Sequence, residues 1–159
     1  MHQKISYTSS QFKVEYNREI GKAKQELFKQ AFRRIEFSIS KGFHLEAITI
    51  IESLMCDRLE TSVSVLNGEK IKPMNLGPLL KIAKGLPEFP QELIIEIDSW
   101  RKDRNLVMHQ MVKITHHEVF DWHSRMKYAR VTAVTGNDLI KKLHLVVGKI
   151  KRNHKRSNR

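Results

Sequence analysis

The chain has 159 residues, of which 29 are Lys or Arg and 17 are Asp or Glu, so its formal net charge is +12. This length suits one domain, and 40% hydrophobic residues suffice for a packed core, which excludes a wholly disordered chain. The single cysteine, Cys56, cannot form an internal disulfide, which excludes a secreted disulfide scaffold. The sequence contains no signal-peptide pattern and no apolar run of about 18 residues, so we expect a cytoplasmic protein that does not enter a membrane.

The positive charge is concentrated at the C-terminal end. The last acidic residue is Asp138, and removing the eight basic residues beyond it leaves 21 basic against 17 acidic residues, a net charge of +4. A concentrated basic end either attracts the phosphates of nucleic acid or simply solubilises a terminus. We predict a basic tail over residues 151–159, and the candidate RNA-binding residues are Lys149, Lys151, Arg152, Lys155 and Arg156.

The chain contains only seven glycines and four prolines and no sustained alternation of apolar and polar residues, which predicts an all-α fold. We expect an up-and-down bundle of four to five helices in one domain over residues 1–150. The first helix is predicted over 11–39, with an apolar stripe of Tyr16, Ile20, Ala23, Leu27, Ala31 and Ile35. The second is predicted over 44–66, because Asn67 and Gly68 both tolerate positive φ and end a helix readily.

The rest of the chain is predicted to contain one short helix and three longer ones. Residues 67–90 hold all four prolines and indicate a connection with a short helix over 79–83. A long helix is expected from 90 or 91 to about 112. The sequence Thr115 to Glu118 has the capping-box pattern, which predicts a fourth helix from there to about 134. Residues 135–138 indicate a second break, followed by a last helix that leads into the tail.

The helix over 91–112 carries the residues with chemistry. Its core-facing stripe steps by three and four residues and contains one charged residue: Leu93, Ile97, Trp100, Arg104, Val107 and Met111. A guanidinium keeps its charge, so a buried Arg104 requires an anionic partner. One interpretation is therefore a structural arginine that pairs with Glu46 or Glu52 of the second helix. The neighbouring seam places Asn105 and His109 one helical turn apart on the same side.

The segment Arg104-Asn105-Leu106-Val107-Met108-His109 resembles the motif of the HEPN domain family (higher eukaryote and prokaryote nucleotide-binding), whose nuclease members carry Arg-Asn-x-x-x-His. The resemblance implies a metal-independent endoribonuclease, of the toxin-antitoxin or phage-defence type, with Arg104, Asn105 and His109 as catalytic residues. It also implies a homodimer whose two motifs form one cleft, an RNA substrate, and an antitoxin or regulatory protein as partner. Candidate supporting residues are Glu46, Asp98 and Arg101, although an ion pair on the surface is the simpler interpretation of Asp98 and Arg101.

The spacing of the motif raises a geometric question. The side chains of residues five apart on an ideal α-helix point in directions about 140° apart around the helix axis, so Arg104 and His109 do not share a face. The arginine side chain could curl around the helix, the helix could deform near Met108, or the two residues could serve different halves of a composite site. A two-fold dimer would provide the third arrangement, and we favour it.

Two alternatives to an enzyme remain open. One is a non-catalytic nucleotide- or RNA-binding helical module in which Arg104 is structural or binds phosphate. The other is an interaction protein with a structural arginine. We predict no metal site and no cofactor, because His116, His117 and His123 lack a matching set of further ligands. Cys56 is predicted to be a small core residue rather than a nucleophile.

Overall fold

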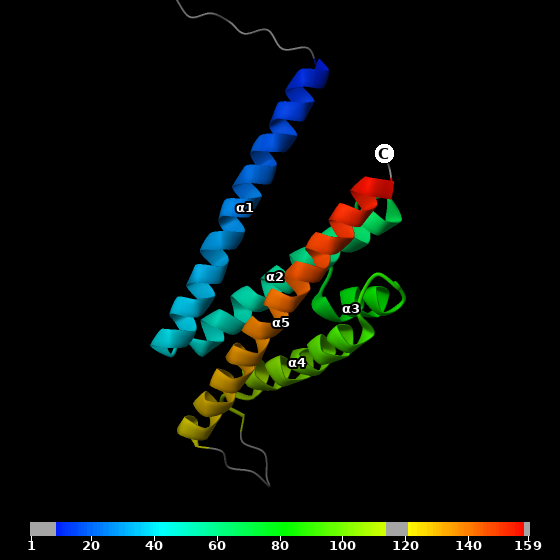
Figure 1. Ribbon diagram of the computed structural model, residues 1–159. Helices are drawn as coiled ribbons and strands as arrows, with labels where there is room; N and C mark the ends of the chain where they lie inside the picture. The colour runs from blue at the N-terminus through cyan, green and yellow to red at the C-terminus, as the bar shows by residue number, and fades with distance from the viewer. Residues whose placement is uncertain (1–8, 114–120, 158–159) are drawn as a thin grey trace, which may run out of the picture. The chain divides into compact units, whose positions relative to one another are not determined.

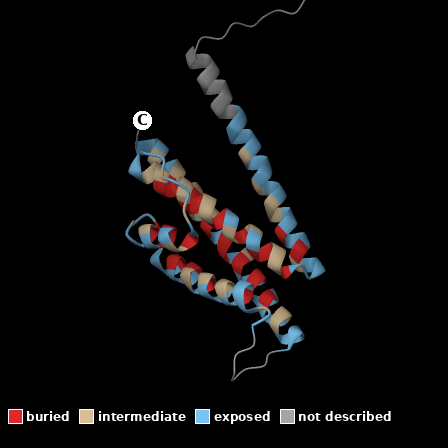
Figure 2. Ribbon diagram, turned by 180° about the vertical axis from the view of Figure 1, so that it is seen from behind, coloured by how far each residue is buried: buried red, intermediate tan, exposed pale blue. Residues whose placement is uncertain are grey.

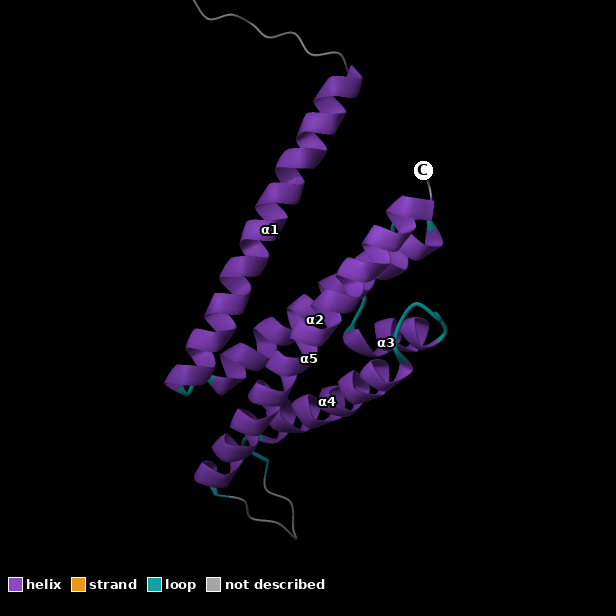
Figure 3. Ribbon diagram, in the orientation of Figure 1, coloured by secondary structure: helices purple, strands orange, loops and turns teal. Residues whose placement is uncertain are grey.

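A computed structural model describes residues 9–113 and 121–157 of the chain, with side chains from residue 19 onward. The described residues form five helices and no strand, which confirms the predicted all-α class (Figure 3). None of these helices is long and apolar enough to cross a membrane. By its internal contacts the chain divides into two units, the first ending at Arg34 and the second beginning at Ile35.

The first unit contains most of helix α1 (Ser9–Lys41), which ends before Gly42 at a φ of 82°. The predicted apolar stripe of this helix contains Ile20 and Leu27, which are 47% and 65% exposed. The physical reason is that the described part of the first unit contains no second element that could cover the apolar side of α1. Tyr16 lies outside the residues whose side chains are described.

The second unit is a helical bundle built from the end of α1 and from α2 (His44–Asn67), α3 (Leu76–Lys84), α4 (Gln91–Gln110) and α5 (Trp122–Ser157). Helices α2 and α5 lie side by side and run in the same direction, and α4 runs the opposite way along α5 (Figure 1). The short α3 contacts both α2 and α4. Buried residues line the inner sides of these helices (Figure 2).

Local sequence explains where the helices begin and end. Gly68 ends α2 in the left-handed conformation, at a φ of 73°, as the Asn-Gly pair predicted. The described part of α5 begins after Asp121, whose Oδ1 accepts a hydrogen bond from the Ser124 amide at 2.7 Å and so caps the helix. This bond is the main reason why the pKa of Asp121 is lowered. The predicted capping box at residues 115–118 lies outside the described residues.

The prediction of a helix break over residues 135–138 is wrong, because α5 continues through this segment to Ser157. Gly136 is buried there, and a Cβ atom on it would lie only 2.6 Å from Nε1 of Trp100. The same indole nitrogen donates a hydrogen bond to the Thr132 carbonyl at 2.8 Å. The glycine thus makes room for a tryptophan from α4 and does not end the helix. Since α5 extends through 151–157, the predicted tail boundary at residue 150 falls inside a helix.

Candidate active site

The motif lies in the last two turns of α4. Along the whole of α4, four residues of the stripe that the sequence placed in the core are buried: Leu93, Ile97, Trp100 and Val107. Helix α4 stays α-helical to Gln110, so no deformation near Met108 brings Arg104 and His109 onto one face. Packing of the stripe therefore fixes Arg104 toward the interior of the bundle and leaves His109 on the outer side of the last turn.

Arg104 forms an ion pair with a carboxylate from α2. Its Nη2 contacts Oε2 of Glu52, and the two side chains are 20% and 21% exposed. Its Nη1 donates a hydrogen bond to Oδ1 of Asn105 at 2.6 Å. Burial lowers the pKa of the guanidinium. Of the two partners that the sequence offered, Glu52 is the one that meets Arg104, while Glu46 accepts a hydrogen bond from Ser38 at 3.0 Å.

The other two motif residues differ in their surroundings. Asn105 is half-buried and is held by the Arg104 guanidinium. His109 is exposed in the last turn of α4. Within one chain the structure thus brings together Arg104, Asn105 and Glu52, and it leaves His109 at the solvent. An exposed imidazole can accept or donate a proton, and a guanidinium held by Asn105 and Glu52 presents a fixed positive charge.

The candidate supporting residues Asp98 and Arg101 form the ion pair that the sequence suggested. Nε of Arg101 lies 2.8 Å from Oδ1 of Asp98, three residues earlier on the same helix. The Arg101 guanidinium also approaches α3, where a Cβ atom on Gly77 would lie 3.8 Å from it. These two residues thus help to fix the surface between α3 and α4. They do not contact Arg104 in any hydrogen bond or ion pair found among the described residues.

The predicted RNA-binding residues all lie on the last turns of α5. Four of them are exposed on this helix, whereas Lys151 is half-buried: the exposed residues are Lys149, Arg152, Lys155 and Arg156. Ile150, between them, is buried. Because these cations lie on a helix, their backbone positions relative to one another are fixed. The basic end is therefore a structured surface through Ser157.

Sequence reasoning missed a charged cluster between α2 and α5. Arg58 is only 7% exposed, and its Nε lies 3.9 Å from Oδ2 of the half-buried Asp57. Burial lowers the pKa of His144 on α5, and the positive charges of Arg58 and Lys151 lower it further. The sequence contains a pattern that indicates burial of Arg58, because Met55, Arg58 and Ser62 recur at three- and four-residue steps beside the apolar stripe of α2.

Two further sequence predictions concern reactive or metal-binding side chains. Cys56 is half-buried, and burial raises the pKa of its thiol to about 11, so the thiol stays protonated near neutral pH. Among the described residues no group of three His, Cys, Asp or Glu side chains is placed to hold a metal ion. His123 is exposed, and His116 and His117 lie outside the described residues.

The comparisons with known proteins add no family to these observations. The chain matches no protein-family model, no curated protein and no solved structure.

Proposed function

We propose that this chain is a metal-independent endoribonuclease of the toxin or host-defence type, acting as a homodimer on RNA. The observation that carries the proposal is the arrangement at the end of α4. Asn105 and Glu52 hold the Arg104 guanidinium, and the imidazole of His109 is open to solvent. These residue types at this place match the needs of RNA cleavage, which are a proton-transfer group and a fixed cation for the phosphate.

The chemistry needs no group from outside the protein and the RNA. His109 takes the proton of a ribose 2′-hydroxyl, and the 2′ oxygen attacks the adjacent phosphorus while the bond from phosphorus to the 5′ oxygen breaks. The leaving 5′ oxygen takes a proton from a second imidazole, and the product carries a 2′,3′-cyclic phosphate. Arg104 stabilises the extra negative charge on the phosphate. Because Arg104 and His109 point to different sides of α4, a composite site from two copies supplies both groups to one phosphate.

A second candidate is a non-catalytic RNA- or nucleotide-binding helical module. The observation that favours it is the ion pair between Arg104 and Glu52, since a cation neutralised by a carboxylate has less charge to offer a phosphate. In this case Arg104 holds α4 against α2, and the basic face of α5 binds the polyanion. An intact RNA that is still retarded in a gel would identify this function.

The test compares His109→Ala with His123→Ala in a cleavage assay on unstructured RNA with EDTA present. Both histidines are exposed, so both variants should fold, and only the first changes the motif. We expect His109→Ala to lose cleavage by at least about a hundredfold and His123→Ala to keep it. A 2′-deoxy substitution at the cut site should block the reaction. Cleavage that survives in His109→Ala would show that the proposed active site is wrong.

Arg104 requires a design that separates catalysis from folding. Arg104→Ala alone leaves the Glu52 carboxylate without its cation, so the protein could lose activity by losing stability. The double variant Arg104→Ala with Glu52→Ala removes both charges and is expected to melt closer to the wild type than Arg104→Ala does. If the stable double variant still cuts RNA, Arg104 has a structural role, as the second candidate function assumes.

A further inference from the structure

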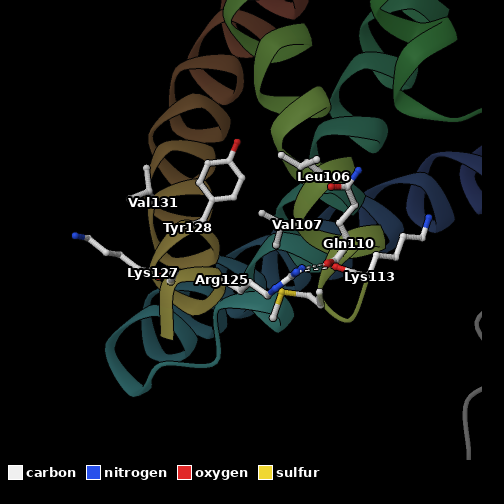
Figure 4. A pocket seen from close by; sticks show the side chains of 10 residues that line it. Leu106, Val107, Gln110, Lys113, Arg125, Lys127, Tyr128 and Val131 are labelled. Carbon is white, nitrogen blue, oxygen red and sulfur yellow. Dashed lines mark hydrogen bonds between the residues drawn. The ribbon is translucent and has the colours of Figure 1, made fainter. Parts of the chain in front are cut away.

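A pocket lies between the last turns of α4 and the first turns of α5 (Figure 4). Its volume is about 500 Å³, which is within the range of small-ligand sites. Apolar side chains from both helices line it together with polar and charged ones: the lining residues are Leu106, Val107, Gln110, Met111, Lys113, Ser124, Arg125, Lys127, Tyr128 and Val131. No predicted site residue lies among them.

The walls of the pocket are fixed by contacts between the two helices. Arg125 of α5 donates hydrogen bonds to the carbonyls of Gln110 and Lys113, the latter at 2.7 Å, and so satisfies acceptors at the end of α4 (Figure 4). The hydroxyl of Tyr128 donates to Oδ1 of Asp103 at 2.8 Å. This bond holds the aromatic ring against α4, where it forms one side of the pocket.

The charged residues that line the pocket are all basic. Lys113 and Lys127 are exposed, Arg125 adds a third cation, and none of the ten lining residues is acidic. An apolar floor with a cationic rim matches a ligand that has a flat apolar part and negative charges beside it.

The pocket borders the motif. Leu106 and Val107 stand between Asn105 and His109 in the sequence, and Gln110 follows His109 directly. Leu106 and His109 are three residues apart, so their Cβ atoms are neighbours on the outer side of α4, about 5–6 Å apart. A polynucleotide that crosses the end of α4 therefore meets the imidazole and the pocket opening within about one nucleotide step.

We propose that this pocket binds one unpaired base of a single-stranded RNA. The base stacks on the Tyr128 ring above the apolar floor, and the flanking phosphates face Lys113 and Lys127. Gln110 and Ser124 offer amide and hydroxyl groups to the edge of the base. The inference deepens the proposed endoribonuclease, because it makes the pocket the subsite that selects the base next to the cut phosphate.

The experiment measures binding of a fully 2′-O-methylated, unstructured oligonucleotide, which cannot be cut by 2′-hydroxyl attack, by fluorescence anisotropy. Val131→Trp fills the pocket, and Val134→Trp places the same ring one turn further along α5, outside the pocket. Both valines are exposed, at 55% and 42%, so both variants should fold. We expect Val131→Trp to weaken binding about tenfold and Val134→Trp to leave it within about twofold. Equal effects of the two substitutions, or none, would overturn the proposal.

Two controls test what the pocket recognises. Tyr128→Ala removes the ring and should weaken binding about tenfold, whereas Tyr128→Phe keeps the ring, loses only its bond to Asp103 and should weaken binding less. An abasic oligonucleotide of equal length keeps the phosphates, so Val131→Trp should no longer matter with this probe. If Val131→Trp weakens binding of the abasic probe as strongly, the pocket contacts backbone or another partner and the inference fails.

The outcomes separate this inference from the proposed function. If wild-type protein cuts RNA and Val131→Trp changes neither binding nor the bases at which it cuts, the base subsite is wrong and the nuclease stands. If Val131→Trp weakens binding of the methylated oligonucleotide while the wild type leaves RNA intact, the subsite stands in a protein that binds without cutting.

Discussion

The contact between Trp100 and Gly136 determines how closely α4 and α5 pack. The indole is 2% exposed and donates its hydrogen bond to a carbonyl of the facing helix at the turn where the glycine sits. With hydrogen in place of a side chain, Gly136 lets the ring lie against the α5 backbone. A glycine inside a helix costs about 1 kcal/mol relative to alanine, so the ring contact must more than offset this cost.

We predict that Gly136→Ala destabilises the protein by about 1–3 kcal/mol, because its methyl group would overlap the Trp100 ring in a buried contact. The control is Gly148→Ala on the same helix. A Cβ atom there would lie 3.4 Å from the end of the flexible Arg152 side chain, which can move. This variant should gain up to about 1 kcal/mol from helix propensity. Urea unfolding of the two proteins measures both values, and equal stability changes would contradict the packing argument.

The candidate site shows what sequence can and cannot determine at this scale. The motif and the polar seam of Asn105 and His109 could be predicted, because helical spacing depends only on local sequence. The choice of Glu52 over Glu46 as the partner of Arg104 could not, because it depends on the register between α2 and α4. The pocket between α4 and α5 was missed for the same reason, since its two walls come from different helices.

At the scale of whole elements, helices α2, α3 and α4 agree with the prediction to within a few residues. Their apolar residues repeat with the helical period, and a glycine or proline stands at one end of each helix: Gly68 after α2, Gly85 after α3 and Pro90 before α4. The prediction failed where a glycine had a tertiary role. Residues 135–138 resemble a helix end in local sequence, and only the Trp100 ring from another helix explains why α5 continues.

The interfaces of the helices in the second unit contain two histidines whose pKa is lowered. Burial lowers the pKa of His44 at the start of α2, and the positive charge of Arg130 adds to this effect. Burial and the charges of Arg58 and Lys151 lower the pKa of His144. Each histidine therefore binds a proton less readily in the folded protein than in the unfolded chain, where its pKa is near 6.5.

It follows that the free energy of unfolding should decrease on acidification. The contribution of these histidines is fully present above about pH 6.5, the unfolded pKa, and is lost as the pH falls from there through the lower folded pKa. We expect urea midpoints to fall between about pH 7.5 and pH 5.5. The double variant His44→Gln with His144→Gln should show a flatter pH dependence, whereas His123→Gln should keep it. A double variant with the wild-type slope would show that other groups control the dependence.

For the whole molecule, the distribution of charge matters more than its total. Eight cations follow Asp138 on α5 and beyond, whereas residues 1–138 together carry only +4. The exposed cations near the end of α5 are held by a helix, and the buried Ile150 anchors that helix in the bundle. Deleting the end from residue 149 would remove this anchor as well as the charge, so neutralisation by substitution is the cleaner test.

We predict that changing Lys149, Arg152, Lys155 and Arg156 together to Gln weakens RNA binding and its salt dependence. Each phosphate contact that is lost should lower the slope of log affinity against log salt by about 0.7 for a single strand, hence by up to about 3 for four contacts. A matched variant removes four exposed cations elsewhere, at Lys22, Lys29, Arg33 and Lys70. If RNA contacts the end of α5, only the first variant changes the slope strongly. Each variant removes four positive charges, so equal slopes would mean that RNA binding depends only on the net charge of the protein.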